Sequence, residues 1–296
     1  MNAHALVFVA APDNKPAYRE ALMMLGRVAL ARKLPPPAVL SGWESAEWIY
    51  DSVDAELREG AAAAVSPFPV DWALVAVEGR RKKLLVADMD STIINVECLD
   101  ELADFAGIKA EIAAITERAM AGELEFEPAL TLRVGKLKGL ALGVLQRCYD
   151  ERVRLNPGAE ILARTMAAHG ARCVLVSGGF SFFTTRVAQA AGFHADHANT
   201  LLDDGKALTG EVAAPILGRA AKLQALQSEA AAISATPQDA LAIGDGANDL
   251  DMIKAAGLGI AYRAKPAVAA QAHARIAHTP LETALFFQGY RRSEFA

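Results

Sequence analysis

The sequence of 296 residues has few cysteines and no long apolar run. Cys98, Cys148 and Cys173 are far apart and form no CxxC pair, so we expect reduced thiols in a cytoplasmic protein rather than a disulfide framework. No stretch approaches ~18 uninterrupted apolar residues, which argues against a membrane-spanning helix. The first ten residues lack the basic flank of a secretion signal, and their short apolar run predicts a strand instead.

The sequence also has fewer basic than acidic residues. The 35 acidic residues outnumber the 30 lysines and arginines, which gives a net charge of −5. This balance argues against nucleic acid or an anionic membrane as a partner. A small anionic substrate is compatible with it, because a pocket can be locally positive inside an acidic protein. What the sequence does have, 53% hydrophobic and 22% charged residues, is typical of a globular protein with one large or two modest domains.

Residues 1–80 predict a small α/β domain in which catalytic side chains are not concentrated. Pro35-Pro36-Pro37 breaks the chain near its middle. No clear βαββαβ pattern with four strands is visible. The elements that we expect, in chain order, are a strand over Leu6–Ala10, a helix over Pro16–Ala31, a helix around Ala46–Ala64 and a strand over Trp72–Val77.

Residues 81–296 have a different rhythm, in which short apolar runs alternate with helical stretches. This alternation predicts an α/β fold with a doubly wound parallel (Rossmann-like) sheet. The interval from Asp100 to Asn156 is helical throughout, so we expect a cap inserted at about residues 100–156. A hairpin over Leu201–Val212 has the turn residues Asp203-Asp204-Gly205-Lys206. The apolar runs that we expect to be buried strands are residues 84–87, 172–176, 240–243 and 258–261.

The residues suited to catalysis are concentrated where three of these runs end. In a doubly wound sheet the carboxyl ends of the strands meet at one crevice, where ligands bind. The first run continues into Asp88-Met-Asp90-Ser-Thr92, whose two carboxylates would repel each other unless a cation lies between them. Oxygen-only ligands favour magnesium. One carboxylate can then attack phosphorus while the other transfers protons.

The second and third runs end in residues that can hold phosphate and metal. Ser177-Gly178-Gly179 precedes a helix that we expect to begin near Phe180, and free backbone N–H groups at a helix N-terminus bind anions. The third run continues into the segment Gly244–Asp249, in which Asp245 is a candidate metal ligand and Asp249 can support it.

Lys222 lies at the expected start of the helix before the third run, where it could neutralise a phosphate and the attacking carboxylate together. Taken singly, a solvated lysine is the simpler interpretation. Ordinary turns would likewise explain the glycine motifs, and an acidic cap would explain the first carboxylate pair. The convergence of all four features on one edge of the sheet favours the catalytic interpretation.

In chain order, DMDST, VSGG, Lys222 and GDGANDLDM resemble the four motifs of the haloacid-dehalogenase-like phosphatases. The segments Asn95–Ala103 and Phe126–Val134 also resemble the substrate-recognition segments of the phosphoserine phosphatases within that group. The resemblance covers about residues 84–280. It implies a magnesium-dependent phosphatase that hydrolyses O-phosphoserine to serine, the last step of serine biosynthesis, through an aspartyl-phosphate.

The resemblance also implies a role for each motif residue. Asp88 would be the nucleophile and a metal ligand. Asp90 would protonate the leaving oxygen, later activate water, and bind magnesium through its carbonyl oxygen. Asp245 would complete the metal ligands, with Asp249 supporting it. The residues that would hold the phosphate are Ser177, Gly178, Gly179, Lys222 and Asn248.

The amino-acid end of phosphoserine would be recognised by the cap. Glu97 can pair with the substrate ammonium, and Arg133 can grip its carboxylate with a bidentate fork. Met120 and Phe126 resemble the family's apolar cap wall, which would exclude water on closure. Taken singly, the two charged residues also fit exposed helix positions, and Phe126 fits simple packing inside the cap.

Three alternatives stay open at this point. Phosphohomoserine or phosphothreonine could be the substrate of a related phosphatase or phosphotransferase. A non-catalytic phosphoserine-binding regulator would not need the nucleophile Asp88. Many members of the family that this sequence resembles carry a ferredoxin-like regulatory domain at the position of residues 1–80. In this protein the segment could equally serve in docking or in a homodimer.

Overall fold

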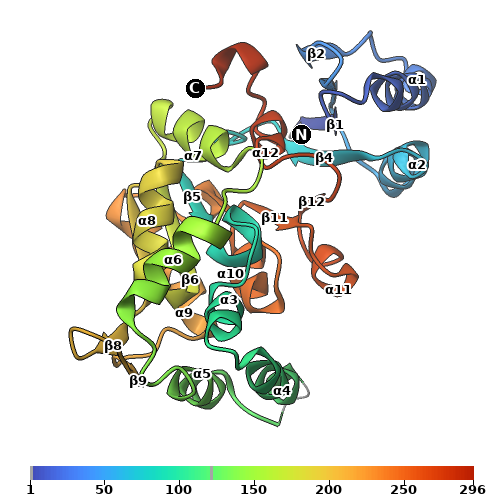
Figure 1. Ribbon diagram of the computed structural model, residues 1–296. Helices are drawn as coiled ribbons and strands as arrows, with labels where there is room; N and C mark the ends of the chain where they lie inside the picture. The colour runs from blue at the N-terminus through green and yellow to red at the C-terminus, as the bar shows by residue number, and fades with distance from the viewer. Residues whose placement is uncertain (1–2, 121–122) are drawn as a thin grey trace.

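The computed structural model describes residues 3–120 and 123–296, apart from the side chains of Met120 and Arg219. The chain builds a four-stranded sheet, a six-stranded sheet and a two-stranded hairpin (Figure 1). Within the described residues, no helix combines the length and the apolar character needed to cross a membrane. The division of the chain into domains at residue 80 stays a prediction.

The first sheet is antiparallel, with the strand order β2-β3-β1-β4. Together with its two helices it follows the chain order βαββαβ, which is the ferredoxin-like connectivity that the sequence did not reveal. The Asp54 side chain accepts a hydrogen bond from the Leu57 amide and so caps the second helix. The elements are β1 (His4–Ala10), α1 (Lys15–Ala31), β2 (Ala38–Ser41), β3 (Ser45–Tyr50), α2 (Ala55–Val65) and β4 (Val70–Ala76).

The expectation of a helix around Ala46–Ala64 was wrong over its first part. Ala46, Trp48 and Tyr50 are buried in β3, and this spacing of two is the period of a strand with one covered face. Small and aromatic residues separated by Glu47 and Ile49 obscured that period. The predicted helix survives only as α2, which begins at Ala55.

Both faces of the first sheet are covered. Leu6 and Phe8 of β1 pack with α1 and α2, while Val7 and Val9 on the opposite face belong to the main core of the molecule. Because strand side chains alternate between faces, a single strand joins two hydrophobic clusters. The first sheet is therefore packed against the rest of the protein on the face that its own helices leave open.

The second sheet confirms the predicted doubly wound parallel fold. Its strand order is β12-β11-β10-β5-β6-β7, and neighbouring strands pair in parallel along the whole sheet. The chain leaves β5 in one direction for β6 and later returns to β10 on the other side, so the strand order reverses at β5. The strands are β5 (Leu84–Ala87), β6 (Arg172–Phe180), β7 (Ala195–Asn199), β10 (Ala240–Gly244), β11 (Leu258–Tyr262) and β12 (Ala274–Ile276).

Helices lie on both faces of this sheet. One face is covered by α7 (Ala159–Ala168), α8 (Ser181–Ala191) and α12 (Thr283–Phe287). The other face is covered by α9 (Arg219–Ala232) and α10 (Leu250–Ala255), while the short α11 (Pro266–Ala269) lies between β11 and β12 in the chain. A sheet covered on both faces needs strands without polar positions, which is why 84–87 and 240–243 read as continuous apolar runs.

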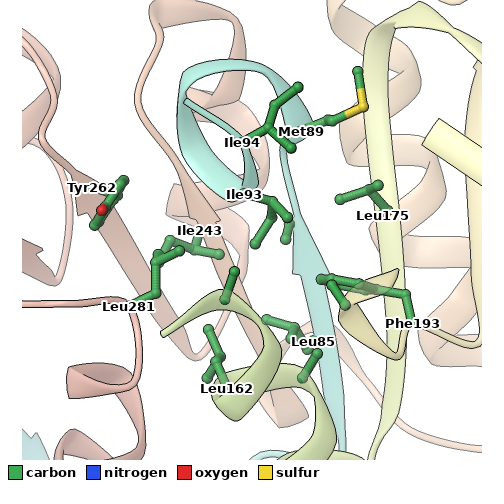
Figure 2. Close-up of a cluster of buried hydrophobic side chains, with 14 of the residues drawn as sticks. Leu85, Met89, Ile93, Ile94, Leu162, Leu175, Phe193, Ile243, Tyr262 and Leu281 are labelled. Carbon is green, nitrogen blue, oxygen red and sulfur yellow. The ribbon is translucent and has the colours of Figure 1, made fainter. Parts of the chain in front are cut away.

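The larger core fixes the chain where it leaves β5. Figure 2 shows Leu85 and Ile243 from two neighbouring strands packed with Leu162 of α7, and Ile93 in the turn that follows β5. Each of these side chains is fully buried. Burial of a large aliphatic side chain contributes about 1.5–3 kcal/mol. The turn of residues 88–93 is thus anchored from below by packing rather than left as a mobile loop.

A helical cap follows this turn, as the helical pattern of residues 100–156 led us to expect. The predicted hairpin is also confirmed. It is attached to the cap by two backbone hydrogen bonds, in which the Gly139 amide donates to Leu208 O at 2.8 Å and the Leu142 amide donates to Lys206 O at 3.0 Å. In Figure 1, the cap helices α4 and α5 lie at the opposite end of the molecule from the first sheet. The elements are α3 (Cys98–Phe105), α4 (Lys109–Met120), α5 (Phe126–Gly135), α6 (Leu142–Arg152), β8 (Leu201–Asp203) and β9 (Leu208–Val212).

Candidate active site

A pocket of about 180 Å³ lies where β5, β6 and β10 end beneath the cap. Most of the residues singled out in the sequence line it, although they come from segments more than a hundred residues apart. Asp249 lies just behind the wall, and the side chain of Met120 lies outside the described residues. The predicted residues that line the pocket are Asp88, Asp90, Glu97, Phe126, Arg133, Ser177, Gly178, Gly179, Lys222, Asp245 and Asn248.

Asp88 is the first residue after β5 and is held in an extended conformation. Its amide donates to Ile243 O of β10 at 3.0 Å, which continues the sheet pairing beyond the strand. The carboxylate is 5% exposed and lies 2.6 Å from Lys222 Nζ. The same ammonium lies 2.5 Å from Asp249 Oδ1. Lys222 is therefore a buried lysine shared by two carboxylates, and the interpretation as a solvated helix lysine is wrong.

Negative charge is concentrated in this part of the pocket. Burial raises the pKa of Asp88 well above its usual range, and the nearby charge of Asp249 raises it further. Burial also raises the pKa of Asp245, again with a contribution from Asp249. For Lys222 burial acts to lower the pKa, but Asp88 and Asp249 together outweigh it and the net shift is upward. One ammonium faces three carboxylates, so the cluster favours a further cation.

The donors of this cluster fit a divalent metal ion. One carboxylate oxygen from each of Asp88, Asp245 and Asp249 lies within 4.8 Å of the others. Asp245 is additionally positioned by Thr92, whose hydroxyl donates to its carboxylate at 3.0 Å. Asp249 is positioned by the Gly246 amide at 3.0 Å. Two of the three carboxylates are thus oriented by hydrogen bonds, and Asp88 is held by its ion pair with Lys222, so the cluster offers a hard cation several fixed oxygen ligands.

Asp90 lies two residues after Asp88, but its carboxylate contacts other groups. Cys98 N, in the first turn of α3, donates to Oδ1 at 2.9 Å, and the Ser177 hydroxyl donates to Oδ2 at 3.0 Å. The chain turns sharply just after it, because Ser91 has a φ of 56°. Burial raises the pKa of Asp90. A carboxyl group that tends to keep its proton suits the role of a general acid.

The strand that contains Ser177-Gly178-Gly179 is longer than the expected 172–176, whereas the helix starts next to the expected Phe180. Strand β6 continues through Phe180, and α8 begins at Ser181. The parallel neighbour β7 explains the extension, because Phe180 still pairs with Asn199. A Cβ atom on Gly179 would lie 2.8 Å from Asp90 Oδ2, so only glycine lets the backbone approach this carboxyl group.

Glu97 and Arg133 reach the pocket from the cap. The Ser91 hydroxyl donates to Glu97 Oε1 at 2.6 Å. Burial against the pocket wall and the charge of Asp90 raise the pKa of Glu97 to about 7, although part of the side chain still contacts solvent. Burial lowers the pKa of Arg133. Within the described residues its side chain donates only to Ala129 O, at 3.3 Å, which leaves most of the guanidinium free for an anion.

The pocket also contains apolar residues that the sequence reasoning missed: Leu99, Leu130 and Phe180. Leu130 precedes Arg133 by three positions on α5, so the two lie on one face of the helix, and this spacing could have identified it. Phe126 closes the same side, since a Cβ atom on Gly178 would lie 3.1 Å from its ring. The pocket therefore pairs a polar floor with an apolar cap wall.

Comparison with known proteins identifies the family to which the chain is similar. Residues 85–254 match the family model of the haloacid dehalogenase-like hydrolases. The chain is 40% identical over 274 residues to the phosphoserine phosphatase of Streptomyces coelicolor, which covers 91% of this chain but 65% of that longer protein. It is 35% identical over 283 residues to the probable phosphoserine phosphatase of Schizosaccharomyces pombe, covering 95% of this chain and 94% of the relative.

The fold is similar to that of a solved structure over nearly its whole length. A hydrolase of the same family from Salmonella enterica subsp. enterica serovar Typhi aligns with a TM-score of 0.85 at 28% identity. The alignment covers 97% of this chain and 98% of the other. The likeness therefore includes the first sheet as well as the part that matches the family model.

Proposed function

The chain belongs to the haloacid dehalogenase-like hydrolases, and on this premise we propose that it hydrolyses O-phosphoserine to serine and phosphate. A single pocket brings a buried carboxylate beside a buried lysine, a second carboxyl group, and an acidic and a basic residue from the cap. The relatives named as phosphoserine phosphatases support the choice of substrate. Mere binding of phosphoserine would not need both Asp88 and Asp90.

We assign the metal site to magnesium, which favours oxygen ligands and retains several waters. Asp88, the carbonyl oxygen of Asp90 and Asp245 would hold the ion, and Asp249 would support them. When bound, the ion supplies positive charge that neutralises the phosphate and polarises its oxygens. The raised pKa values of Asp88 and Asp245 support this assignment, because they reflect a cluster with too little positive charge.

The reaction proceeds in two displacements at phosphorus. An Asp88 carboxylate oxygen attacks phosphorus while the bond to the serine oxygen breaks, and Asp90 gives its proton to that leaving oxygen. Asp90, now ionised, takes a proton from water as the water oxygen attacks phosphorus. The bond to Asp88 breaks, phosphate leaves, and both carboxyl groups return to their starting states.

The remaining polar residues orient the phosphoryl group. The Ser177 hydroxyl now donates to Asp90, and phosphate oxygens offer it an alternative acceptor. Gly178, Gly179 and Asn248 line the same side of the pocket. Lys222 holds its charge between Asp88 and Asp249, where it can stabilise the negative charge that spreads over the phosphoryl oxygens.

The cap residues fit the amino-acid end of the substrate. Glu97 would bind the ammonium and Arg133 the carboxylate, while Phe126 and Leu130 keep water from the reacting centre. The pocket volume of about 180 Å³ is suited to a small phosphomonoester rather than to a macromolecule.

We propose a cytoplasmic location on the basis of the three separate cysteines, all of which are free and buried. For residues 1–80 we propose a domain of its own. Its contribution could be regulatory, or it could support a homodimer.

Phosphate release in the presence of magnesium tests the proposal. The substrates are phosphoserine, phosphothreonine, phosphohomoserine and p-nitrophenyl phosphate. We expect phosphoserine to have the highest kcat/KM. Arg133→Ala should raise the KM for phosphoserine by about 10–100-fold, as expected for a lost charged hydrogen bond, and leave p-nitrophenyl phosphate unaffected.

Arg118→Ala, on the exposed surface of the cap, is the control. Absence of phosphate release from the intact protein would refute the proposed phosphatase activity. A preference for phosphohomoserine, or an Arg133→Ala variant with unchanged KM, would refute the serine specificity and leave the phosphatase chemistry standing.

A further inference from the structure

A second hollow, of about 510 Å³, lies between the first sheet and the edge of the six-stranded sheet. It shares no residue with the active pocket. Its walls come from α2 and β4 on one side and from α11 and β12 on the other. Strands β4 and β12 are edge strands of their sheets and lie side by side in Figure 1. A neighbouring hollow of about 210 Å³ shares Arg58, Leu74 and His273 with it, so the two form one groove along β4.

The walls of this groove are held in fixed positions by one buried carboxylate. Asp71 of β4 is 1% exposed and accepts hydrogen bonds from the amides of Ala277, His278 and Thr279 at 2.8–2.9 Å. The Thr279 hydroxyl adds a fourth bond at 2.6 Å. The segment after β12 is thus tied to β4. A groove between two elements joined in this way is formed before any ligand arrives, which lowers the entropy cost of binding.

Arg58 and Arg275 extend into the groove from opposite walls. Both are exposed, and neither side chain has an ion pair or hydrogen bond within the part of the chain that the structure describes. Other arginines at the same junction are paired: Arg80 with Glu47 and Arg292 with Glu44. In a protein of net charge −5, two unpaired guanidinium groups that face one groove favour an anion there.

The remaining wall residues restrict the kind of anion. Glu59 lines the larger hollow and Glu78 the smaller one, so the anion must reach both arginines and avoid these two carboxylates. Two separate guanidinium groups match a dianion better than a single carboxylate, which one guanidinium fork can satisfy alone. Trp72 and Phe68 add half-buried aromatic surface, against which a flat ring can stack.

We propose that the groove between α2, β4 and β12 binds a small molecule that carries a flat ring and a doubly charged phosphate group. The ring packs against Trp72, and the phosphate lies between Arg58 and Arg275. The ligand touches both sheets, so it binds the assembled protein and stabilises the junction between them.

Adenosine 5′-monophosphate is a suitable probe, with adenosine and inorganic phosphate as its two halves. We expect it to quench tryptophan fluorescence in a saturable way, because Trp72 lines the groove. Calorimetry on the same solutions gives its affinity. Adenosine and inorganic phosphate should each bind the groove at least about tenfold more weakly, since each lacks one of the two contacts.

The double variant Arg58→Gln/Arg275→Gln should weaken the binding of adenosine 5′-monophosphate at least about tenfold, with unchanged hydrolysis of phosphoserine and unchanged thermal unfolding. Arg27→Gln is the matched control, because it removes an exposed arginine from α1, outside the groove. The proposal is overturned if the probe does not saturate at millimolar concentration, if the double variant binds it as tightly as the unmodified protein, or if Arg27→Gln weakens it equally.

Discussion

Asp71 lies in β4 and Asp88 directly follows β5. Both aspartates are buried, but the groups around their carboxylates differ. Asp71 is surrounded by donors, three backbone amides and one hydroxyl. Asp88 has a single lysine near it and shares that lysine with Asp249. Burial and Asp249 raise the pKa of Asp88 well above its usual range.

The difference separates a structural carboxylate from a reactive one. Asp71 is fully hydrogen-bonded within the protein, so its charge is stabilised and has no capacity left for chemistry. Asp88 lacks such donors, and a cation together with a phosphoryl group would complete its environment. A buried charge that is left incompletely satisfied marks a functional site, although its cost reduces the stability of the empty protein.

The largest effect should follow from changing the reactive aspartate. Asp88→Asn replaces the attacking carboxylate with a neutral amide, which is a poor nucleophile, so we expect kcat for phosphoserine to fall by at least about 10⁴-fold. The metal-free variant should unfold at the same temperature as the unmodified protein or higher, because a charge disfavoured by burial and by Asp249 is gone. Phosphate release and thermal unfolding in EDTA measure the two effects. A variant that unfolds several degrees lower would show that Asp88 contributes to stability in the same way as Asp71.

The reverse pattern should follow from changing the structural aspartate. Asp71→Ala leaves three amides and a hydroxyl without their acceptor, so we expect a loss of about 3–5 kcal/mol in the free energy of unfolding. The folded fraction should keep its kcat, because the active pocket shares no residue with this junction. Urea unfolding followed by circular dichroism measures the loss. Asp51→Ala, at an exposed position directly after β3 of the same sheet, is the control and should change stability by less than about 0.5 kcal/mol.

A smaller effect should appear in the pH dependence of stability. Burial and the charge of Asp90 raise the pKa of Glu97 to about 7 in the folded protein, from an ordinary value of 4.5 that applies in the unfolded chain. The folded state therefore binds more protons between these values, and stability falls as the pH rises through this window. Asp88, Asp90 and Asp245 shift in the same direction.

Glu97→Gln should reduce the loss of thermal stability between pH 5 and pH 8 in EDTA, and should raise the KM for phosphoserine about 10–100-fold. Glu117→Gln, an exposed position of α4, serves as the control. An unchanged pH profile in Glu97→Gln would mean that Glu97 ionises as a solvated carboxylate, unlike the other acidic residues of the pocket.

The catalytic half of the molecule could be predicted from the sequence more completely than the first sheet. The apolar runs at 84–87 and 240–243 are buried strands with no polar position, and each ends directly in its motif. In the first sheet β2 and β3 are short, and the alternation in β3 is carried by residues as different as Ala46 and Trp48. A strand of four to six residues with mixed side chains gives too weak a periodic signal to be distinguished from a helix.

In the active pocket, the types and order of the residues in the sequence identified the polar side chains. They did not identify the groups with which these side chains form hydrogen bonds and contacts. The apolar Leu99 has no chemical signature in the sequence, because a leucine on a cap helix suggests packing, and Leu130 could have been found only through its spacing from Arg133. The binding of Ser177 to Asp90 likewise could not be anticipated, because the two lie 87 residues apart. Roles assigned to individual residues by resemblance stay predictions until the variants are measured.

The sequence by itself determined the parallel sheet, the order of the motifs and the family, because apolar runs and turn residues act locally. Only the tertiary structure decided how each buried carboxylate is satisfied. Asp71 finds its donors about 207 residues further along the chain, and Lys222 reaches Asp88 from a helix that follows the cap. Such contacts depend on how distant segments pack. The same residue type thus became a structural anchor at Asp71 and a candidate nucleophile at Asp88.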